Sequence, residues 1–257
     1  MPCSETHKQW EALASSWIQR CHEGEPNREG MLDRWMLATL GGVSGSRIVD
    51  LGCGEGRFCR MLSRLGATYV LGIDLCEGLV KEAVAQKTAS VEHYLTGNAE
   101  TLNAVEDQFF DIAVSYISLV DIADLGAVIA SSYRVLKPGG RFVVCNLAPM
   151  ATAQNTRITD PDGTRTAFRV DHYFDESARV SRILGHELTN YHRTLSTYIN
   201  GFLRLGYVLQ GIYEPRPEQA DLAHYPELTN ELRAPGFIIY DLLKPVAIPS
   251  KTEMRGR

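Results

Sequence analysis

Hydrophobic and polar residues recur along this chain with two periods, that of a strand and that of a helix, and the order in which these periods occur predicts the fold. From residue 47 onward, apolar runs of strand length are separated by stretches in which apolar residues recur at helical spacing. The predicted strands are 47–51, 68–74, 91–97, 110–119 and 141–147, and the predicted helices between them are 57–66, 77–87 and 125–136. Strand–helix–strand units of this length need crossover connections, which predicts a parallel sheet with helices on both faces.

The flanking segments follow other patterns. Near the N-terminus, Trp10, Leu13 and Trp17 share one face of a predicted helix, and a second helical segment runs from Pro26 to Gly41. Within 148–190, a Pro-Asp-Gly turn and an alternating stretch predict a small antiparallel insertion. Beyond it, an amphipathic helix over 193–206 precedes two closing strands, 207–215 and 236–245, which we expect to be antiparallel neighbours.

Composition limits what this chain does. Its 257 residues, 44% of them hydrophobic, suit one sizeable domain. A net charge of −5 provides no general attraction to nucleic acid or anionic lipid, and no apolar run approaches the roughly 20 residues that span a bilayer. The first residues lack the basic and apolar regions of a signal peptide, so we expect a cytoplasmic protein. The six cysteines form no C-x-x-C pair, which favours reduced thiols over disulfides or a zinc site.

The stretch VDLGCGEGRF, at 49–58, carries the clearest chemical signal. Its glycines, Gly52, Gly54 and Gly56, follow a strand that ends in Asp50. A dinucleotide-binding turn needs G-x-G-x-x-G, but here the third glycine comes one residue early and Arg57 occupies the glycine position. A P-loop is excluded because no Gly-Lys-Ser/Thr follows. The pattern therefore predicts a turn that a ligand without phosphate approaches closely, since glycine has no Cβ to obstruct it.

Two further strand ends extend this predicted site. Asp74 closes the second strand, 22 residues after Gly52, at the position from which a carboxylate reaches both hydroxyls of a ribose. Asn98, Ala99 and Glu100 follow the third strand, where an adenine edge can be recognised. A nucleoside that carries an amino-acid tail meets all of these demands.

Five segments over 47–147 together resemble the signature segments of class I S-adenosylmethionine-dependent methyltransferases: VDLGCGEGRF, LGIDL, GNAETL, FDIAVSYISLVDI and LKPGGRFVV. The resemblance implies an α/β fold with a seven-stranded, mostly parallel Rossmann-like sheet and a reversed last hairpin. On this basis we expect five parts: a helical cap or lid (1–42), a cofactor-binding core (43–147), a substrate-side insertion (148–190), the C-terminal helix and closing strands (191–245), and a flexible tail (246–257). The periodicity of the Trp10 and Trp17 face favours packing on the core, and the alternative is a lid that closes over a bound ligand.

The resemblance also implies roles for individual residues. Asp50 would lie near the amino group of S-adenosylmethionine, Asp74 would bind the ribose, Leu75 would pack on the adenine, and Ser115 and Tyr116 would border the sulfonium. The complete predicted cofactor-binding set is Asp50, Gly52, Cys53, Gly54, Gly56, Asp74, Leu75, Asn98, Ala99, Glu100, Ser115, Tyr116 and Trp17. The expected product is S-adenosylhomocysteine, and no metal is expected.

The segment after the fourth strand, SYISLVD, indicates the acceptor class by what it lacks. It contains neither the Asn/Asp-Pro-Pro-Tyr that holds amino groups of bases nor the Pro-Cys of covalent base methylation. The paired glutamates of protein arginine methyltransferases are missing, and Asp121 and Asp124 alone do not complete a magnesium site of the catechol type. These absences favour a small-molecule acceptor, with no nucleic acid or membrane partner and a monomeric or homodimeric protein.

Candidate acceptor-side residues lie in and beyond the insertion. A base is needed only when the acceptor must lose a proton, and histidine, with a pKa of about 6.5, suits that task. We expect His192, His172 and Tyr116 to face the substrate. The alternative is that the residues before the last helix only cap it, and that Arg193 pairs with Glu187 rather than with a substrate carboxylate.

Aromatic residues around the insertion indicate a ring-shaped acceptor, because they provide flat apolar walls. These residues are Phe168, Tyr173, Phe174, Tyr191, Tyr198 and Phe202. We therefore predict a methyltransferase acting on an oxygen or nitrogen of a small, aromatic or heterocyclic metabolite. The alternatives are a tRNA or protein methyltransferase, a non-catalytic S-adenosylmethionine-binding protein and, disfavoured by Arg57, a dinucleotide oxidoreductase.

Overall fold

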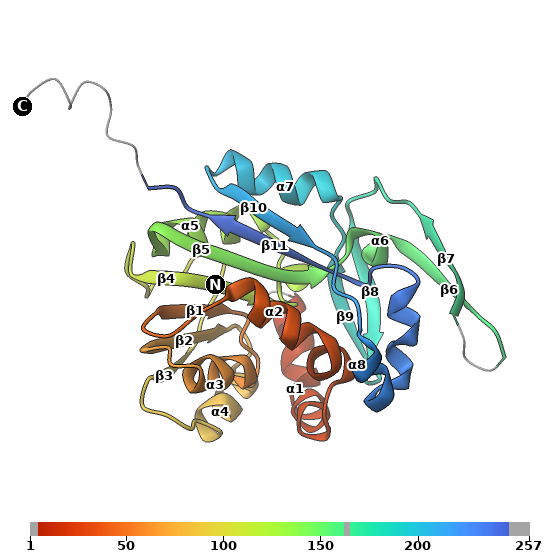
Figure 1. Ribbon diagram of the computed structural model, residues 1–257, viewed down its shortest axis with the longest axis horizontal. Helices are drawn as coiled ribbons and strands as arrows, with labels where there is room; N and C mark the ends of the chain where they lie inside the picture. The colour runs from red at the N-terminus through yellow and green to blue at the C-terminus, as the bar shows by residue number, and fades with distance from the viewer. Residues whose placement is uncertain (1–4, 162–164, 247–257) are drawn as a thin grey trace, which may run out of the picture.

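A seven-stranded sheet forms the centre of the molecule, which a computed structural model describes over residues 5–161 and 165–246, without the side chains of 154–157, 159 and 165–168. Its strand order is β10-β11-β5-β4-β1-β2-β3 (Figure 1). Strands β1 to β5 are parallel to one another, β11 is antiparallel to β5, and β10 is antiparallel to β11. The strands are β1 (Arg47–Leu51), β2 (Tyr69–Asp74), β3 (Glu92–Thr96), β4 (Phe110–Tyr116), β5 (Leu136–Leu147), β10 (Val208–Tyr213) and β11 (Phe237–Leu243). The predicted Rossmann-like sheet with a reversed last hairpin is confirmed.

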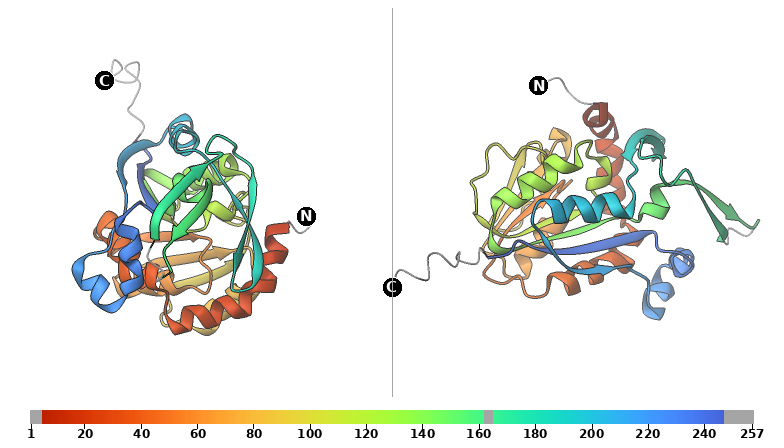
Figure 2. Two further views of the ribbon diagram at one scale, coloured as in Figure 1. Left: turned by 90° about the vertical axis from the view of Figure 1, so that its right-hand side faces the viewer. Right: turned by 90° about the horizontal axis from the view of Figure 1, so that it is seen from above.

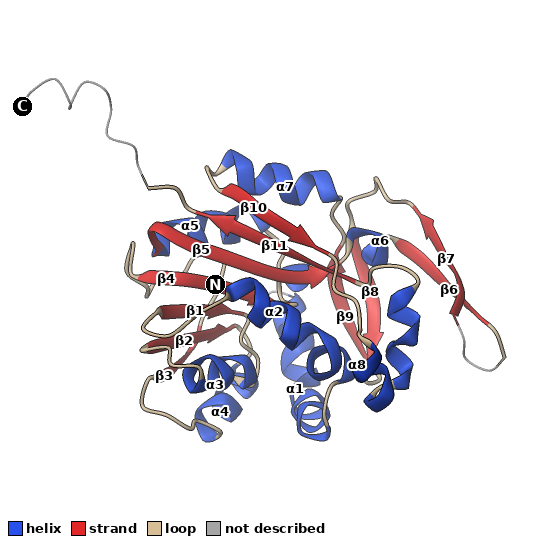
Figure 3. Ribbon diagram, in the orientation of Figure 1, coloured by secondary structure: helices blue, strands red, loops and turns tan. Residues whose placement is uncertain are grey.

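Helices cover both faces of this sheet (Figure 3). On one face, α2 (Asp33–Leu40) and α3 (Arg57–Arg64) bury Met36 and Phe58 against Ile48. On the other lie α5 (Leu125–Val135) and α7 (Leu195–Arg204) (Figure 2), whose Ile129 and Phe202 belong to the buried cluster that contains Val49. Because both faces are covered, consecutive residues of β1 enter opposite cores, which explains why its sequence is an almost continuous apolar run.

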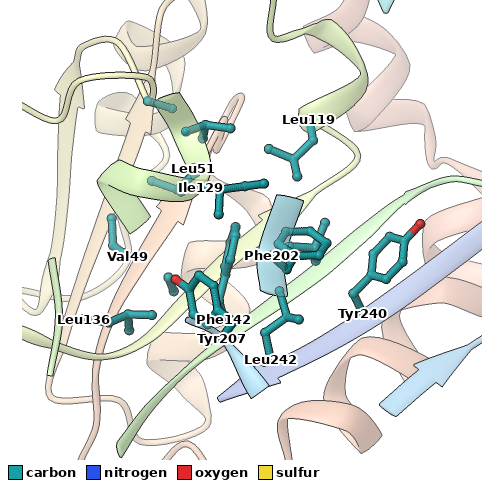
Figure 4. Packing of buried hydrophobic residues seen from close by; sticks show 14 of the residues in the cluster. Val49, Leu51, Leu119, Ile129, Leu136, Phe142, Phe202, Tyr207, Tyr240 and Leu242 are labelled. Carbon is teal, nitrogen blue, oxygen red and sulfur yellow. The ribbon is translucent and has the colours of Figure 1, made fainter. Parts of the chain in front are cut away.

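The larger of the two cores lies under α5 and α7. There, Phe142 of β5 and Phe202 of α7 meet edge to face at 6.3 Å, and Tyr240 of β11 packs beside them (Figure 4). All three side chains are fully buried. This packing joins the C-terminal helix and strands to the strands that carry the predicted cofactor site.

The N-terminal helix α1 (Glu5–Glu23) crosses α4 (Glu77–Ala85) at the edge of the sheet domain. Ala14 packs against Cys76 and Leu79, and Trp10 and Trp17 lie beside this cluster. The Glu11 carboxylate accepts a hydrogen bond from the Glu77 N–H at 2.6 Å, which places a negative charge at the α4 N-terminus, where it is favourable. A π-helix, η1 (Arg28–Leu32), then leads directly into α2, where a single helix was expected.

The insertion contains two hairpins, where one was predicted. The expected hairpin consists of β6 (Gln154–Thr159) and β7 (Arg165–Asp171), and most of its Pro-Asp-Gly turn lies outside the described residues. The second hairpin, β8 (Ala178–Ile183) and β9 (His186–Tyr191), was missed. Its two-residue turn has positive φ at both positions, +49° at Leu184 and +83° at Gly185, a geometry that usually carries Asn-Gly. Figure 1 shows β6–β7 projecting from the body, with β8–β9 beside α1.

Short elements complete the chain. They are η2 (Leu119–Asp121), α6 (Pro149–Thr152), α8 (Gln219–His224) and η3 (Pro226–Leu232). The last two, between β10 and β11, were not predicted; Arg34 anchors them through Glu218 and Asp221, each at 2.7 Å. The five cysteines of the described residues are free thiols, and none of the described helices is both long and apolar enough to cross a membrane. The predicted tail lies outside the described residues except for Val246.

Candidate active site

A cavity of about 520 Å³ opens at the carboxyl ends of the parallel strands. Segments that follow β1, β2, β3 and β4 line it, and it is also lined by α1 and by the β8–β9 hairpin. In a sheet of this type, ligands bind beyond the carboxyl ends of the strands, where the strand order reverses. Here that point lies at β1, because β2 and β3 lie on one side of it and β4 and β5 on the other.

The three glycines of the turn after β1 have three different reasons to be glycine. All have positive φ, +79° at Gly52, +57° at Gly54 and +80° at Gly56. A Cβ on Gly52 would overlap the Cβ of Ser118, and a Cβ on Gly56 would lie 2.7 Å from the Tyr94 ring. Only at Gly54 would a Cβ meet open space. The expected close approach of a ligand therefore applies to Gly54, while the other two make room for the protein itself.

Asp74 joins this turn to the end of β2. One of its carboxylate oxygens accepts the Gly54 N–H at 2.8 Å, and the other accepts the Cys76 N–H at 2.9 Å. Burial raises the pKa of Asp74, and these two hydrogen bonds oppose that shift. Each oxygen keeps a second lone pair, so the carboxylate can still accept two hydroxyl hydrogens from a ligand in the cavity. Leu75, 36% exposed, lines the cavity beside it.

Asp50 places a partly unsatisfied carboxylate at the cavity. It lies in the middle of the sheet, paired with Gly72 on one side and Val114 on the other, and is 1% exposed. The Cys59 thiol donates to Oδ2 at 3.3 Å, whereas Oδ1 has no hydrogen-bond partner. Burial raises the pKa of Asp50 to about 7. A buried oxygen without a partner is costly, and a cationic amino group in the cavity would satisfy it.

The end of β3 supplies a third polar group. Asn98 Oδ1 accepts the Glu100 N–H at 2.8 Å, and Glu100 in turn accepts the Asp124 N–H at 2.9 Å. Ala99 lies between them and is almost fully buried. Of the predicted cofactor-binding residues, those that line the cavity are Asp50, Gly52, Cys53, Gly54, Asp74, Leu75, Asn98, Ala99, Glu100, Tyr116 and Trp17. The two that do not line it are Gly56 and Ser115.

Tyr116 lines the cavity, but its hydroxyl is already engaged. It donates to Asp33 at 3.0 Å, and Asp33 also accepts two hydrogen bonds from Arg57, at 2.7 and 2.8 Å. Burial and the Asp33 charge raise the pKa of Tyr116 well above its usual value. The phenol thus holds its proton, and this geometry does not favour Tyr116 as a base. Arg57, the residue that breaks the dinucleotide pattern, fixes the start of α3 to α2.

The structure does not bring the two predicted histidines to the cavity. His192 is 1% exposed, with Nδ1 2.7 Å from the Thr152 hydroxyl and Nε2 2.8 Å from the Tyr173 carbonyl oxygen. Because a carbonyl only accepts, Nε2 carries a proton, and burial lowers the pKa of the ring. His172 lies in the loop after β7, with a φ of +51°, away from the lining residues. Neither ring therefore faces the space where an acceptor fits.

Arg193 and Thr194, the two polar residues directly before α7, hydrogen-bond within the protein. Thr194 caps the helix by accepting the Thr197 N–H at 3.2 Å, as the capping alternative predicted. Arg193 is buried and donates to the carbonyl oxygens of Leu119, Ile122 and Ala123. Its guanidinium also lies over the Tyr191 ring, 5.5 Å from the ring centroid, whereas Glu187 pairs with Arg182. Arg193 therefore fixes the turn that follows β4.

Asp121, at the end of η2, is a polar residue of the cavity that sequence reasoning missed as an acceptor-side group. It lines the cavity and accepts a hydrogen bond from the Asn190 amide, and the Trp10 indole, another lining residue, helps to lower its pKa. Burial raises the pKa of Asp121 to about 7. The SYISLVD segment contains this residue, but its partner Asn190 comes 69 residues later, in the hairpin that was not predicted.

Only one of the predicted aromatic wall residues lines the cavity, Tyr191 of β9. Tyr198 and Phe202 are buried in the core, and Phe174 is 89% exposed. Tyr173 uses its hydroxyl to accept the Leu195 N–H, and the side chain of Phe168 lies outside the described residues. Trp10 and Leu188, which were not among the predicted wall residues, line the cavity instead. Over the described ranges, no group of three or more His, Cys, Asp or Glu side chains is placed to hold a metal ion.

Comparison with known proteins places this geometry in context. A family model described as a methyltransferase domain matches residues 49–144. A solved structure from Listeria monocytogenes, assigned to the S-adenosylmethionine-dependent methyltransferases, is 32% identical, with a TM-score of 0.76 over 85% of this chain and 98% of that one. Two curated relatives are each 36% identical over 104 residues. They are a malonyl-[acyl-carrier protein] O-methyltransferase of Serratia marcescens (40% of this chain, 39% of that protein) and a ubiquinone biosynthesis O-methyltransferase of Bartonella tribocorum (39% and 41%).

Proposed function

The chain belongs to the S-adenosylmethionine-dependent methyltransferases, and we propose that it methylates an oxygen or nitrogen atom of a small aromatic or heterocyclic molecule. One observation carries the proposal. The cavity that contains the β1 turn is also walled by Trp10, Leu188 and Tyr191, from α1 and the β8–β9 hairpin. Flat apolar walls of this kind favour a ring-shaped acceptor over a polymer, which would need an open surface.

The residues present fit the donor. The unpartnered Asp50 Oδ1 suits its ammonium group, the free lone pairs of Asp74 suit the ribose hydroxyls, and Leu75 offers an apolar contact for the adenine. Gly54 leaves open space where a side chain would stand. When bound, the donor supplies a methyl group already activated on a sulfonium. The work left to the protein is to hold the acceptor in line and to exclude water.

Calorimetric titration with S-adenosylhomocysteine tests the donor half. We expect micromolar binding to the wild type, a loss of at least 100-fold in Asp74→Ala, and no comparable binding of NADH. Asp107→Ala is the matched control, because Asp107 is an exposed carboxylate that pairs with Arg134 far from the cavity lining. An unchanged affinity in Asp74→Ala, or tight NADH binding, would contradict this assignment.

The acceptor half needs a separate measurement. Transfer of a radiolabelled methyl group from S-adenosylmethionine into fractions of a cell extract separates the candidate acceptor classes. We expect label in the small-molecule fraction. Label in RNA or protein alone would favour a tRNA or protein methyltransferase, and S-adenosylhomocysteine binding without transfer to any fraction would indicate a binding protein.

A further inference from the structure

We infer that the Asp121 carboxylate binds the hydroxyl group of the methyl acceptor and takes its proton, so that the acceptor is an aromatic alcohol of the phenol type and the product is its methyl ether. This inference rests on the proposed function and narrows it from oxygen or nitrogen to oxygen. It assigns an acceptor-side role to a residue of the turn after β4.

The position of Asp121 is the first support. It closes η2, directly after the strand whose end carries Tyr116, and it lines the same cavity as Asp50 and Asp74. The lining residues contributed by the β8–β9 hairpin are mostly apolar: Ile183, Leu184, Leu188 and Tyr191. Asp121 and Asn190 therefore place a polar pair against apolar walls. This arrangement is typical of a small-molecule site, where a few polar groups orient a largely apolar ligand.

The way Asp121 is held is the second support. Asn190 Nδ2 donates to it, and Asn190 is itself oriented by Ser181, whose hydroxyl donates to the Asn190 amide oxygen at 2.6 Å. The Trp10 indole, from α1, lies in the same cavity lining and helps to lower the pKa of Asp121. The Asn190 donor orients the carboxylate without neutralising it. An ionised carboxylate has about four acceptor sites, so capacity remains for a hydroxyl of the ligand.

Local charges set when this carboxylate can act as a base. Charged and titratable side chains line the cavity with it from several elements: His7, Arg20, Glu25 and Arg28 from the N-terminal segment, Asp50, Cys53, Glu55, Arg57, Asp74, Cys76 and Glu100 from the strand side, Tyr116 of β4 and Tyr191 of β9. Arg193 binds the main chain of the same turn. Burial, with a smaller contribution from the Asp74 charge, raises the pKa of Asp121 to about 7. A base with a pKa near the working pH combines a useful ionised fraction with a real tendency to take a proton.

The inferred step balances. The acceptor oxygen forms a bond to the methyl carbon, the carbon–sulfur bond breaks with its electron pair left on sulfur, and the hydroxyl proton moves to Asp121. A carboxylate and a sulfonium are thereby replaced by a neutral acid and a neutral thioether. Phenol-type hydroxyls ionise near pH 10, so without a nearby base they enter the site protonated and are weak nucleophiles.

The test compares two matched probes, 1-naphthol and 1-methoxynaphthalene, in which a methyl group replaces the hydrogen that Asp121 would accept. Calorimetric titrations are made with S-adenosylhomocysteine saturating. We expect the wild type to bind the naphthol at least tenfold more tightly, in line with a hydrogen bond to a charged acceptor. Asp121→Asn should lose most of this preference and keep its S-adenosylhomocysteine affinity within about threefold.

Asp124→Asn is the matched control, because Asp124 lies in the same segment but caps α5, and asparagine caps helices as well as aspartate does. A second readout is pH. Between pH 8 and 6, naphthol affinity should fall in the wild type as Asp121 gains a proton, and stay level in Asp121→Asn.

Three results would overturn the inference: no preference in the wild type, including no binding of either probe; the same preference in Asp121→Asn; or tighter binding of 1-naphthylamine than of 1-naphthol, which would indicate a nitrogen acceptor. Failure of the wild type to bind S-adenosylhomocysteine would instead overturn the proposed function.

Discussion

The strand side of the cavity, over 49–76, and its hairpin side, made by α1 and 178–193, are held together by different kinds of hydrogen bond. On the strand side, the donors to Asp74 are main-chain N–H groups, those of Gly54 and Cys76. On the hairpin side, side chains from distant segments meet. Asn190 binds Asp121, and the Gln9 side chain accepts the Thr189 N–H at 2.9 Å across 180 residues.

This difference explains what each side can specify. A site made from main-chain groups depends on a short run of sequence with unusual φ values, and the methyltransferase family model matches this region. Contacts between side chains of separate segments can change without disturbing the sheet. We therefore expect the acceptor to be selected on the hairpin side and the donor to be held on the strand side.

The largest effect should come from the strand side, with Gly52→Ala. The new methyl group would both overlap the Ser118 side chain and force a φ of +79° on alanine. We expect a loss of about 4 kcal/mol in the free energy of unfolding. Gly54→Ala is the matched control, because its Cβ meets open space and only the backbone strain remains, about 1 kcal/mol. Urea denaturation measures both.

The two glycine variants also separate stability from binding. Gly54→Ala places its methyl group where the ligand is expected, so its S-adenosylhomocysteine affinity should fall at least tenfold despite its mild effect on stability. Equal losses of stability in the two variants would show that the turn does not distinguish its glycines as the geometry requires.

The next largest effect should come from Arg193→Met, at the junction with the hairpin side. It removes the hydrogen bonds to the carbonyl oxygens of Leu119, Ile122 and Ala123 and leaves buried acceptors unsatisfied. We expect a loss of about 3 kcal/mol and faster amide exchange over residues 117–123. Arg204→Met, at an exposed position in the last turn of α7, should change neither. Unaltered exchange in Arg193→Met would argue against its role as the anchor of this turn.

The smallest effect of the three, Asp50→Asn, should increase stability. In the ligand-free protein the pKa of Asp50 is raised to about 7, so its contribution to the free energy of unfolding falls as pH rises from about 4 to 7 and stays low above that. A rise of this size in the pKa of Asp50 lowers the free energy of unfolding by at most about 4 kcal/mol. We expect the asparagine amide to restore about half of that stability, ~2 kcal/mol, at pH 8.

The same variant should bind S-adenosylhomocysteine at least tenfold more weakly, because a neutral amide cannot form an ion pair with an ammonium group. In the wild type this affinity should fall as pH drops below about 7, where Asp50 gains a proton, and in Asp50→Asn it should be flatter. Thermal unfolding and calorimetry at pH 5 and 8 measure the two effects. A variant that is both less stable at pH 8 and unchanged in affinity would show that Asp50 has neither role.

Sequence reasoning succeeded where structure follows from short-range pattern. It predicted β1 at the observed residues, and it located the turn at Gly52, Gly54 and Gly56 and the carboxylates Asp50 and Asp74 near the ends of β1 and β2. It did less well in the insertion. The β8–β9 turn is formed by Leu184 and Gly185, and leucine at positive φ is not a recognisable turn signal.

The sequence alone determined the core strands and the turn after β1, because strands buried on both faces need apolar runs, and the positive φ values of that turn favour glycine. Only the tertiary structure decided which polar residues line the cavity. His192, the natural candidate by chemistry, is turned inward by Thr152 and Tyr173, whereas Asp121 lines the cavity and is held there by Asn190. The physical reason is that side-chain direction in such a site depends on partners far away in the chain, which no local pattern encodes.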